Sequence, residues 1–265
     1  MHFINRLSVK AIFFFVLFGL QLVTASLLDA LSLSGKEVAD KVHDRYVGDN
    51  SIAKVTMQLV SEDGQVRTRK LTMITQDKDE LRKTFVRFTE PADIAGTGFL
   101  SLEDSDGDTD QFLYLPALKR TRRIVSSQKG RSFVNTDFTY EDMERRPVEE
   151  FDHVVTGIEA LASLECRVLV STPQPEAETE YSKIKSWIPK DIFLPVRAEF
   201  FNDQGRHIKT YTVQSLEKVQ DIWTPVKVTM HDLADNHSTI MHITQIEYNT
   251  DVQDPIFTKR YLERW

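Results

Sequence analysis

The sequence predicts a mainly β protein: one large, strongly curved antiparallel sheet of about eleven strands, with a few short helices. Two observations predict it. Apolar and polar residues alternate with a period of two over most of residues 53–127 and 153–249. The connections between these segments are short turns, and no helical segment is long enough to join parallel strands. No linker or change in composition divides the chain, so we expect a single domain.

A helix is expected before the first strand, within residues 34–50. Ser34 precedes Glu37 by three positions, which is the spacing of a capping box. Val38, Val42 and Tyr46 then recur at helical spacing.

The remaining elements follow in chain order. The segments expected as strands are residues 53–76 (a hairpin around Glu62-Asp63-Gly64), 81–91, 96–103, 111–116, 119–127, 153–159, 164–173, 181–189, 194–219 and 222–249 (with a hairpin turn at Asp235-Asn236). Residues 128–151 lack alternation and are rich in aromatic and acidic residues. We expect an irregular segment there, with a short helix near residues 139–145, and a last short helix within residues 255–265.

The acidic stretch EDSDGDTD raises the alternative of a calcium loop. An EF-hand loop that began at Asp104 would have Thr109 in place of the required glycine and Leu115 in place of the bidentate glutamate. The flanking segments alternate as strands, and Asp106-Gly107 between two apolar runs is typical of a hairpin turn. We therefore expect a turn. A calcium-dependent binding module stays an alternative that a calcium-dependent melting temperature would reveal.

Residues 1–25 are typical of a secretory signal peptide. Arg6 and Lys10 precede the apolar run AIFFFVLFGLQLV, and the small-residue sequence VTA follows it. The run is short for a membrane span, although an uncleaved anchor is the alternative. We expect an exported, soluble protein of 240 residues, residues 26–265, and favour a monomer.

Composition excludes several classes of function. Cys166 is the only cysteine and lies in an apolar segment, so we expect a core residue, with no internal disulfide and no cysteine-based zinc site. The net charge of −7 becomes −9 when Arg6 and Lys10 are removed, which argues against nucleic-acid binding. The basic cluster KRTRR is either a solvated strand face or a contact for an anionic headgroup or an acidic partner.

Catalytic and metal-binding motifs are lacking. The sequence contains no nucleophile elbow, no phosphate loop and no helix with two histidines at metal-ligand spacing. His231, His237 and His242 form a cluster that is typical of solvent-facing strand positions, with a metal site as the alternative. Glu141 and Asp142 are a candidate carboxylate pair without a visible third group. We therefore expect no enzyme, no metal and no cofactor.

Apolar residues at alternate strand positions are the remaining candidates for function. They are Met57, Leu59, Leu71, Met73, Phe85, Phe99, Phe112 and Tyr114. A single curved sheet with few helices leaves a face to fill, so these side chains are expected to line a ligand trough on the concave face. Methionine and phenylalanine suit flexible acyl chains. The alternative is that the N-terminal helix and residues 131–143 fill the trough as a permanent core.

Three blocks of the sequence resemble a known family. FVRFTEPADIAGTGFL, FLYLPALKRTRRI and GRSFVNTDFTYEDM, within residues 85–143, resemble the recurring blocks of the LolA-like outer-membrane lipoprotein-sorting protein family. The matching positions are Pro91, Gly96, Phe99, Leu100, Tyr114, Leu115, Pro116, Arg122, Arg123, Phe133, Asp137, Phe138, Tyr140 and Asp142.

This resemblance implies an unclosed antiparallel barrel of roughly eleven strands with helices as a lid. It also implies a periplasmic carrier of lipid or lipoprotein acyl chains, working with an inner-membrane transporter of the RND (MmpL-like) type, with which relatives in this branch are often associated. We expect the lid around Phe133, Phe138 and Tyr140, and a headgroup or partner contact at Arg122 and Arg123. The alternative is an adaptor subunit of such an exporter, with its trough filled by its own chain.

Overall fold

The computed structural model describes residues 33–78, 81–105 and 107–264. The predicted signal peptide, residues 1–25, lies outside the described residues. Among the described residues, no helix is both long enough and apolar enough to cross a membrane.

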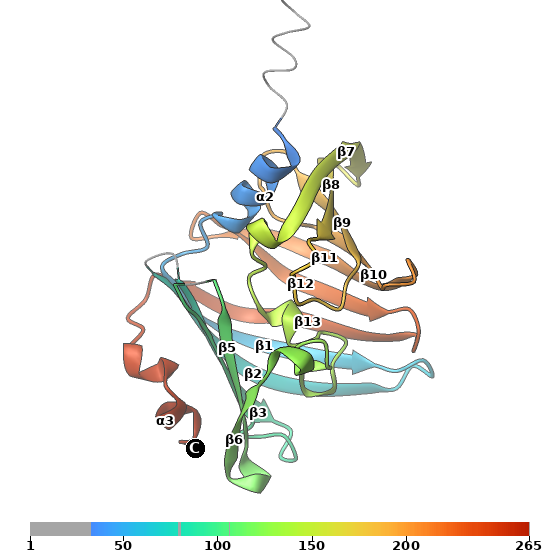
Figure 1. The fold of residues 1–265 in the computed structure, drawn as a ribbon. Helices are drawn as coiled ribbons and strands as arrows, with labels where there is room; N and C mark the ends of the chain where they lie inside the picture. Colours follow the sequence, from blue (N-terminus) through green and yellow to red (C-terminus); the bar gives the residue numbers. More distant parts are fainter. Residues whose placement is uncertain (1–32, 79–80, 106, 265) are drawn as a thin grey trace, which may run out of the picture.

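Within the part of the chain that the structure describes, thirteen antiparallel strands form one continuous sheet, which confirms the predicted fold class (Figure 1). The strands are β1 (Asn50–Val60), β2 (Val66–Lys78), β3 (Leu81–Glu90), β4 (Gly98–Glu103), β5 (Thr109–Leu115), β6 (Arg120–Ile124), β7 (Phe151–Leu161), β8 (Leu164–Pro173), β9 (Lys183–Pro189), β10 (Arg197–Phe201), β11 (His207–Val219), β12 (Ile222–Asp232) and β13 (His237–Tyr248). The count exceeds the expected eleven; residues 194–219, expected as one segment, fold back into two strands, β10 and β11, whereas residues 222–249 form the predicted hairpin of β12 and β13. The turn in the first of these segments has Gly205 at a φ of 69°, which glycine adopts without steric cost.

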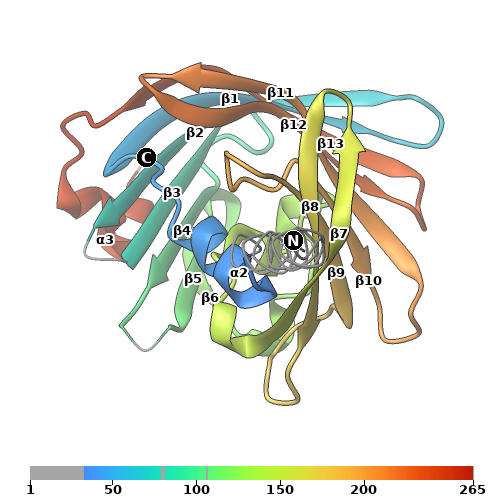
Figure 2. The ribbon, with the colours of Figure 1, turned by 90° about the horizontal axis from the view of Figure 1, so that it is seen from above.

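The strand order places the two edges of the sheet at β6 and β7, which are consecutive in the sequence. Every other consecutive pair of strands is hydrogen-bonded, and β1 joins β13 at the centre. The chain between the two edges, residues 125–150, must therefore cross the open side of the sheet. Figure 2 shows that the sheet curves without closing and that this segment lies inside the curve. We call residues 125–150 the lid segment.

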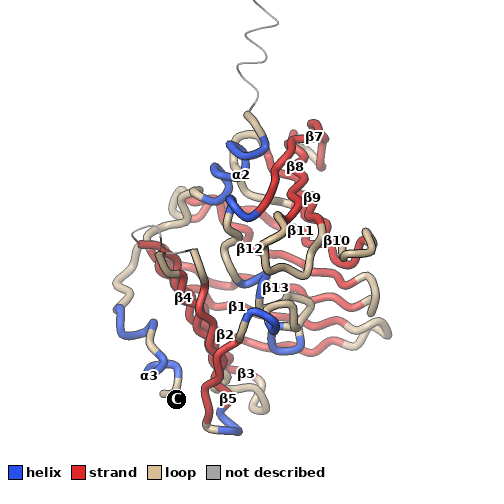
Figure 3. Tube along the Cα trace, in the orientation of Figure 1, coloured by secondary structure: helices blue, strands red, loops and turns tan. Residues whose placement is uncertain are grey.

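Short helices cover the ends and the open side of the sheet (Figure 3). They are α2 (Gly35–His43), η1 (Pro116–Leu118), η2 (Ser126–Gln128), η3 (Phe133–Asn135), η4 (Glu141–Met143), η5 (Val148–Glu150), η6 (Asp254–Phe257) and α3 (Lys259–Leu262). The predicted helix near residues 139–145 is η4, and the predicted last helix is divided into η6 and α3.

Helix α2 begins with the predicted capping box. Ser34 Oγ accepts a hydrogen bond from Glu37 N at 3.2 Å, and the Glu37 carboxylate accepts one from Ser34 N at 2.7 Å. The helix ends at His43, so Tyr46, which was expected on it, lies beyond it and is exposed. The helix contacts β7 so closely that a Cβ atom on Gly35 would lie 2.0 Å from the carbonyl oxygen of His153. Only glycine permits this approach.

The acidic stretch forms the predicted turn between β4 and β5. Asp104 N donates to the carbonyl oxygen of Asp108 at 2.9 Å, and Gly107 has a φ of 86°. Among the described residues, no group of three or more His, Cys, Asp and Glu side chains is arranged to hold a metal ion.

Apolar side chains are buried on both faces of the sheet. The concave cluster joins buried side chains of β1–β7, β9, β10 and β12 to the lid segment, with partly buried side chains of β11 and β13 packed against it, and includes Val55, Leu71, Phe88, Phe99 and Met230. The convex cluster joins outward-facing side chains of β2–β5 to η6 and α3. It consists of Ile74, Phe85, Leu100, Phe112, Tyr114, Phe257 and Leu262.

Candidate functional site

Five of the eight predicted trough residues lie on the concave face. Met57, Leu59, Leu71 and Phe99 are buried in the concave cluster, and Met73 is partly buried against it. These positions come from β1, β2 and β4, which are brought together by the register of the sheet.

The other three predicted trough residues, Phe85, Phe112 and Tyr114, lie in the convex cluster beneath α3. The expectation that all eight residues share one face is therefore wrong. Side chains alternate between the faces of a strand, and the register pairs Phe99 with Leu113 and Leu100 with Phe112. The period of two is visible in the sequence, but the register of one strand against the next is not.

The three predicted lid residues fill the trough. Phe133, Phe138 and Tyr140 belong to the concave cluster, and Phe133 is 2% exposed. The ring of Phe133 meets that of Phe99 edge to face, with the centroids 5.0 Å apart, and that of Tyr140 at 5.7 Å. An acyl chain that lay along this part of the concave face would have to displace these rings.

A buried ion pair fastens the lid segment to β11. Lys209 Nζ lies 2.9 Å from Asp142 Oδ2, and both side chains are only 5–6% exposed. The hydroxyl of Tyr181 donates to the other oxygen of Asp142 at 2.9 Å, and burial raises the pKa of Tyr181 well above its ordinary value. Asp142, one of the two candidate carboxylates of the sequence, therefore contacts Lys209 and Tyr181, and these contacts hold the lid segment in place.

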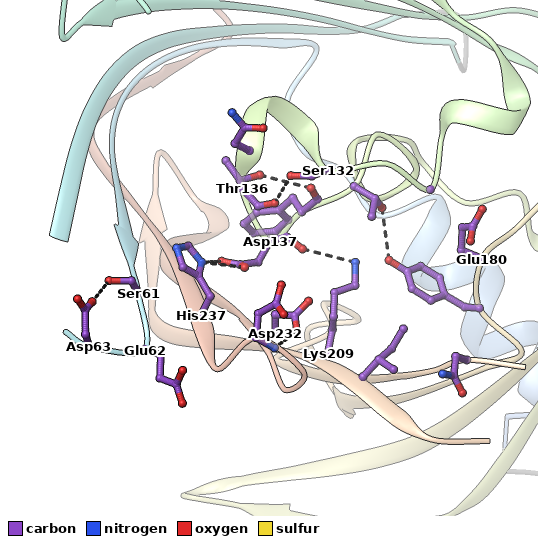
Figure 4. A pocket seen from close by; sticks show the side chains of 18 residues that line it. Ser61, Glu62, Asp63, Ser132, Thr136, Asp137, Glu180, Lys209, Asp232 and His237 are labelled. Carbon is purple, nitrogen blue, oxygen red and sulfur yellow. Dashed lines mark hydrogen bonds and ion pairs between the residues drawn. The ribbon is translucent and has the colours of Figure 1, made fainter. Parts of the chain in front are cut away.

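A second polar contact fastens the lid segment to β13 (Figure 4). The Asp137 carboxylate lies 2.8 Å from His237 Nδ1 and accepts a hydrogen bond from Thr239 Oγ1 at 2.6 Å. The backbone N–H of Asp137 donates to Thr239 Oγ1 at 3.0 Å. His237 was expected to face solvent or a metal, and it instead contacts the lid.

Side chains of the sheet also satisfy the backbone of the lid segment. Arg69 Nη1 donates to the carbonyl oxygen of Val134 at 2.6 Å, and Gln111 Nε2 donates to that of Tyr140 at 2.8 Å. A segment outside the strand ladder needs such partners when it is buried.

Glu144 gives the lid segment a titratable group. Its carboxylate lies 3.0 Å from Lys129 Nζ, so the pair links the two ends of the lid segment. Burial nevertheless raises the pKa of Glu144 to about 7, because desolvation outweighs the attraction of Lys129. This pair could not be predicted from the sequence, because Lys129 and Glu144 are 15 positions apart and share no motif.

Two pockets are lined in part by the lid segment. The polar pocket, of about 810 Å³, lies beside residues 130–139 and is lined by Asp137, Glu180, Lys209 and His237 among others (Figure 4). The arginine pocket, of about 290 Å³, lies between α2, residues 145–148 and strands β8 and β9. Both pockets border the concave cluster, because Phe138 lines the polar pocket and Ile184 lines the arginine pocket.

Arg122 and Arg123 lie on the edge strand β6, where both are exposed. Arg123 forms an ion pair with Asp110 of β5. Neither belongs to the concave cluster, and their contact with a headgroup or partner stays a prediction.

Comparisons with known proteins agree with this architecture. A family model described as "Uncharacterized protein" matches residues 80–264, whereas no curated protein matches the chain. A DUF1329 family protein from Desulfovibrio piger is 27% identical, with a TM-score of 0.81 over 86% of this chain and 97% of its own. A putative outer membrane lipoprotein-sorting protein domain from Vibrio parahaemolyticus is 28% identical, with a TM-score of 0.81 over 87% and 98%. A LolA superfamily protein from Nitrosomonas europaea, 20% identical with a TM-score of 0.68 over 87% and 100%, shares the fold.

Proposed function

Because the chain belongs to the LolA-like outer-membrane lipoprotein-sorting protein family, we propose that it is a cell-envelope carrier of lipid or lipoprotein acyl chains. The observation that carries this proposal is the concave cluster. Trough residues of the sheet and lid residues such as Phe133 meet there in one apolar contact, while polar groups at its margin hold the lid segment.

The chemistry of the exchange is passive. About ten methylenes of an acyl chain contribute on the order of 8 kcal/mol when buried, before ordering costs. Displacement of the lid rings opposes binding and offsets part of this free energy, because the burial of each aromatic side chain stabilises the closed lid by about 1.5–3 kcal/mol. Capture is then favourable and reversible, as a carrier requires.

No catalytic step is needed for this function. Glu141 and Asp142, the candidate carboxylate pair, accept hydrogen bonds from Thr179 and Tyr181 respectively, and so contribute to the closed lid. An RND-type inner-membrane transporter remains part of the proposal as the donor or partner, and its support is the resemblance of residues 85–143 alone.

The depth of the lid rings favours a second function: an adaptor subunit of an exporter whose trough is permanently filled. In this reading Phe133, Phe138 and Tyr140 are core residues and no ligand replaces them.

Titration with a dansyl-labelled fatty acid separates the two functions. Phe133→Ala is compared with Phe257→Ala, because the two phenylalanines are similarly buried but belong to the concave and convex clusters. If the trough takes acyl chains, Phe133→Ala binds the probe about tenfold tighter than the wild type, since one ring no longer needs to be displaced. Phe257→Ala binds like the wild type.

Urea unfolding verifies that each variant is folded before the titration. Absence of binding by both the wild type and folded Phe133→Ala would contradict the carrier function and leave the adaptor function as the remaining proposal. Native mass spectrometry of protein from its own cell envelope, followed by lipid extraction, identifies the cargo class.

A further inference from the structure

The arginine pocket combines an apolar wall with an unusual number of guanidinium groups. Arg45, Arg82, Arg145 and Arg146 line it, and none of its described lining residues is acidic. Its wall includes the apolar residues Val42, Val47, Val148, Leu169, Ile184 and Leu194. Such a combination suits an amphiphile, whose charged group and hydrocarbon need different surroundings.

Three of the four arginines form ion pairs with acidic residues that do not line the pocket. Arg82 contacts the carboxylate of Asp77, and Arg145 contacts that of Glu103 at 2.7 Å. The guanidinium of Arg146 lies 3.5 Å from the carboxylate of Glu141, which is the weakest of the three ion pairs.

Arg45 has no such compensation. Both of its hydrogen bonds leave Nη1 and reach backbone carbonyl oxygens, those of Trp223 at 3.1 Å and Tyr46 at 3.5 Å. Among the described residues no carboxylate contacts Arg45, and its Nε and Nη2 atoms donate no hydrogen bond. Burial lowers the pKa of Arg45, and the neighbouring Arg82 lowers it further. A partly buried guanidinium without an anion is destabilising, which calls for a functional reason.

We propose that the arginine pocket binds the anionic group, a carboxylate or a phosphate, of an amphiphile, with Arg45 as its main contact. The free Nε and Nη2 of Arg45 present the parallel pair of donors that binds such oxyanions in bidentate geometry. This inference rests on the proposed carrier function and specifies its ligand as a lipid with a negative charge at one end.

The pocket borders the concave cluster. Ile184 of β9 lines the pocket and also belongs to the concave cluster. The guanidinium of Arg146 lies over the rings of Phe151 and Tyr181, at 5.7 and 5.9 Å, and both rings belong to the same cluster. An anionic group beside Arg45 therefore leaves its hydrocarbon chain next to the apolar surface that the lid segment covers.

The last residues of the lid segment, 145–148, form part of the pocket wall. Movement of the lid segment away from the trough consequently changes the pocket as well. Binding of the charged group and insertion of the chain are coupled through this one segment.

Displacement of the uncharged fluorophore N-phenyl-1-naphthylamine by three twelve-carbon ligands at pH 8 tests the proposal. Dodecanoate carries a carboxylate, dodecyl phosphate carries a phosphate, and dodecanol is uncharged. The wild type is expected to bind at least one of the two anions about tenfold or more tighter than dodecanol, and the stronger anion distinguishes a fatty-acid-like from a phospholipid-like ligand.

Arg45→Gln is expected to abolish this preference while it leaves the affinity for dodecanol unchanged. Arg45→Lys retains the charge without the bidentate geometry and should keep an intermediate preference. Arg206→Gln, in the exposed turn between β10 and β11, is the matched control and should keep the full preference. Arg122→Gln tests the rival headgroup contact that the sequence predicts on β6. Because Arg45→Gln removes an uncompensated charge, its melting temperature should equal or exceed that of the wild type.

The outcomes separate the two proposals. Equal binding of the three ligands by the wild type, or loss of the preference in Arg122→Gln rather than Arg45→Gln, would overturn the arginine site while chain binding stands. If no ligand displaces the fluorophore, and direct titration also detects no binding, the carrier function itself fails.

Discussion

The concave face of the sheet is covered by the lid segment, whereas the convex face is covered by residues 254–262. Both covers insert aromatic rings, Phe133 on one side and Phe257 on the other. The lid segment is additionally tied by ion pairs between side chains, such as Lys209–Asp142, while α3 is held through its backbone carbonyls by Arg87.

If the protein is a carrier, as proposed, the lid segment is a cover that can be displaced and residues 254–262 are a permanent one. Burial of apolar area contributes throughout the contact, but a buried ion pair contributes little net stability and is lost as a unit once a partner moves. We infer that the lid segment leaves the sheet in discrete steps, and that the C-terminal cover separates only on unfolding.

The largest expected effect is that of Lys209→Met. The variant leaves the Asp142 carboxylate buried without its cation, which lowers the free energy of unfolding by about 3–5 kcal/mol. Urea unfolding measures the loss, and hydrogen exchange of residues 131–142 reports whether the lid opens first. A loss below about 1 kcal/mol would contradict the role given to this pair.

Leu262→Ala tests the opposite face. Leu262 is fully buried in the convex cluster, so its truncation should lower the free energy of unfolding by about 3 kcal/mol. Hydrogen exchange of the lid segment, measured relative to global unfolding, should not change. Selective acceleration in the lid would mean that the two covers are coupled through the sheet.

Glu144 makes stability dependent on pH through the lid. Its pKa rises from about 4.5 to about 7 on folding, so the folded protein holds this proton more tightly than the unfolded chain. The free energy of unfolding should therefore fall as pH rises from about 4.5 through 7, by at most about 3 kcal/mol from this group. Urea unfolding at pH 5.5 and 8.5 should show a smaller decrease for Glu144→Gln than for the wild type; equal decreases would refute this assignment.

The smallest expected effect is that of Thr239→Val, which removes the hydrogen bond that Thr239 Oγ1 donates to the Asp137 carboxylate and the one it accepts from the Asp137 N–H, and should cost about 1–2 kcal/mol. Thr244→Val is the matched control, because Thr244 lies on the same strand and its hydroxyl donates only to the carbonyl oxygen of Lys54 among the described residues. Hydrogen exchange of the lid segment should accelerate in Thr239→Val but not in Thr244→Val. Equal acceleration in both would assign the effect to β13 and not to the lid contact.

Much of the architecture could be predicted because its signals are local. The capping box of Ser34 and Glu37, the turn at Gly107 and the alternation of the strands each depend on a few neighbouring residues. Phe133, Phe138 and Tyr140 were identified through motif positions and lack of alternation, and the structure places all three in the trough.

The arginines illustrate the limit of this reasoning. Arg122 and Arg123 are adjacent in the sequence and form a visible cluster, yet they lie exposed at a sheet edge. Arg45, Arg82 and Arg146 are separated by tens of residues and have no common motif, but they line one pocket. Arginines that are adjacent in the sequence need not form a site, and arginines far apart in the sequence can form one, because the sheet brings distant segments together.

The fold class, the positions of most turns and the segment that covers the trough could be predicted from the sequence, because alternation, glycine and capping act over a few residues. The face that each apolar residue occupies, the acids that hold the lid segment to the sheet and the place where Arg45 meets the apolar wall became known from the folded structure. They depend on strand register and on the pairing of β1 with β13, which are set by cooperative packing of the whole sheet.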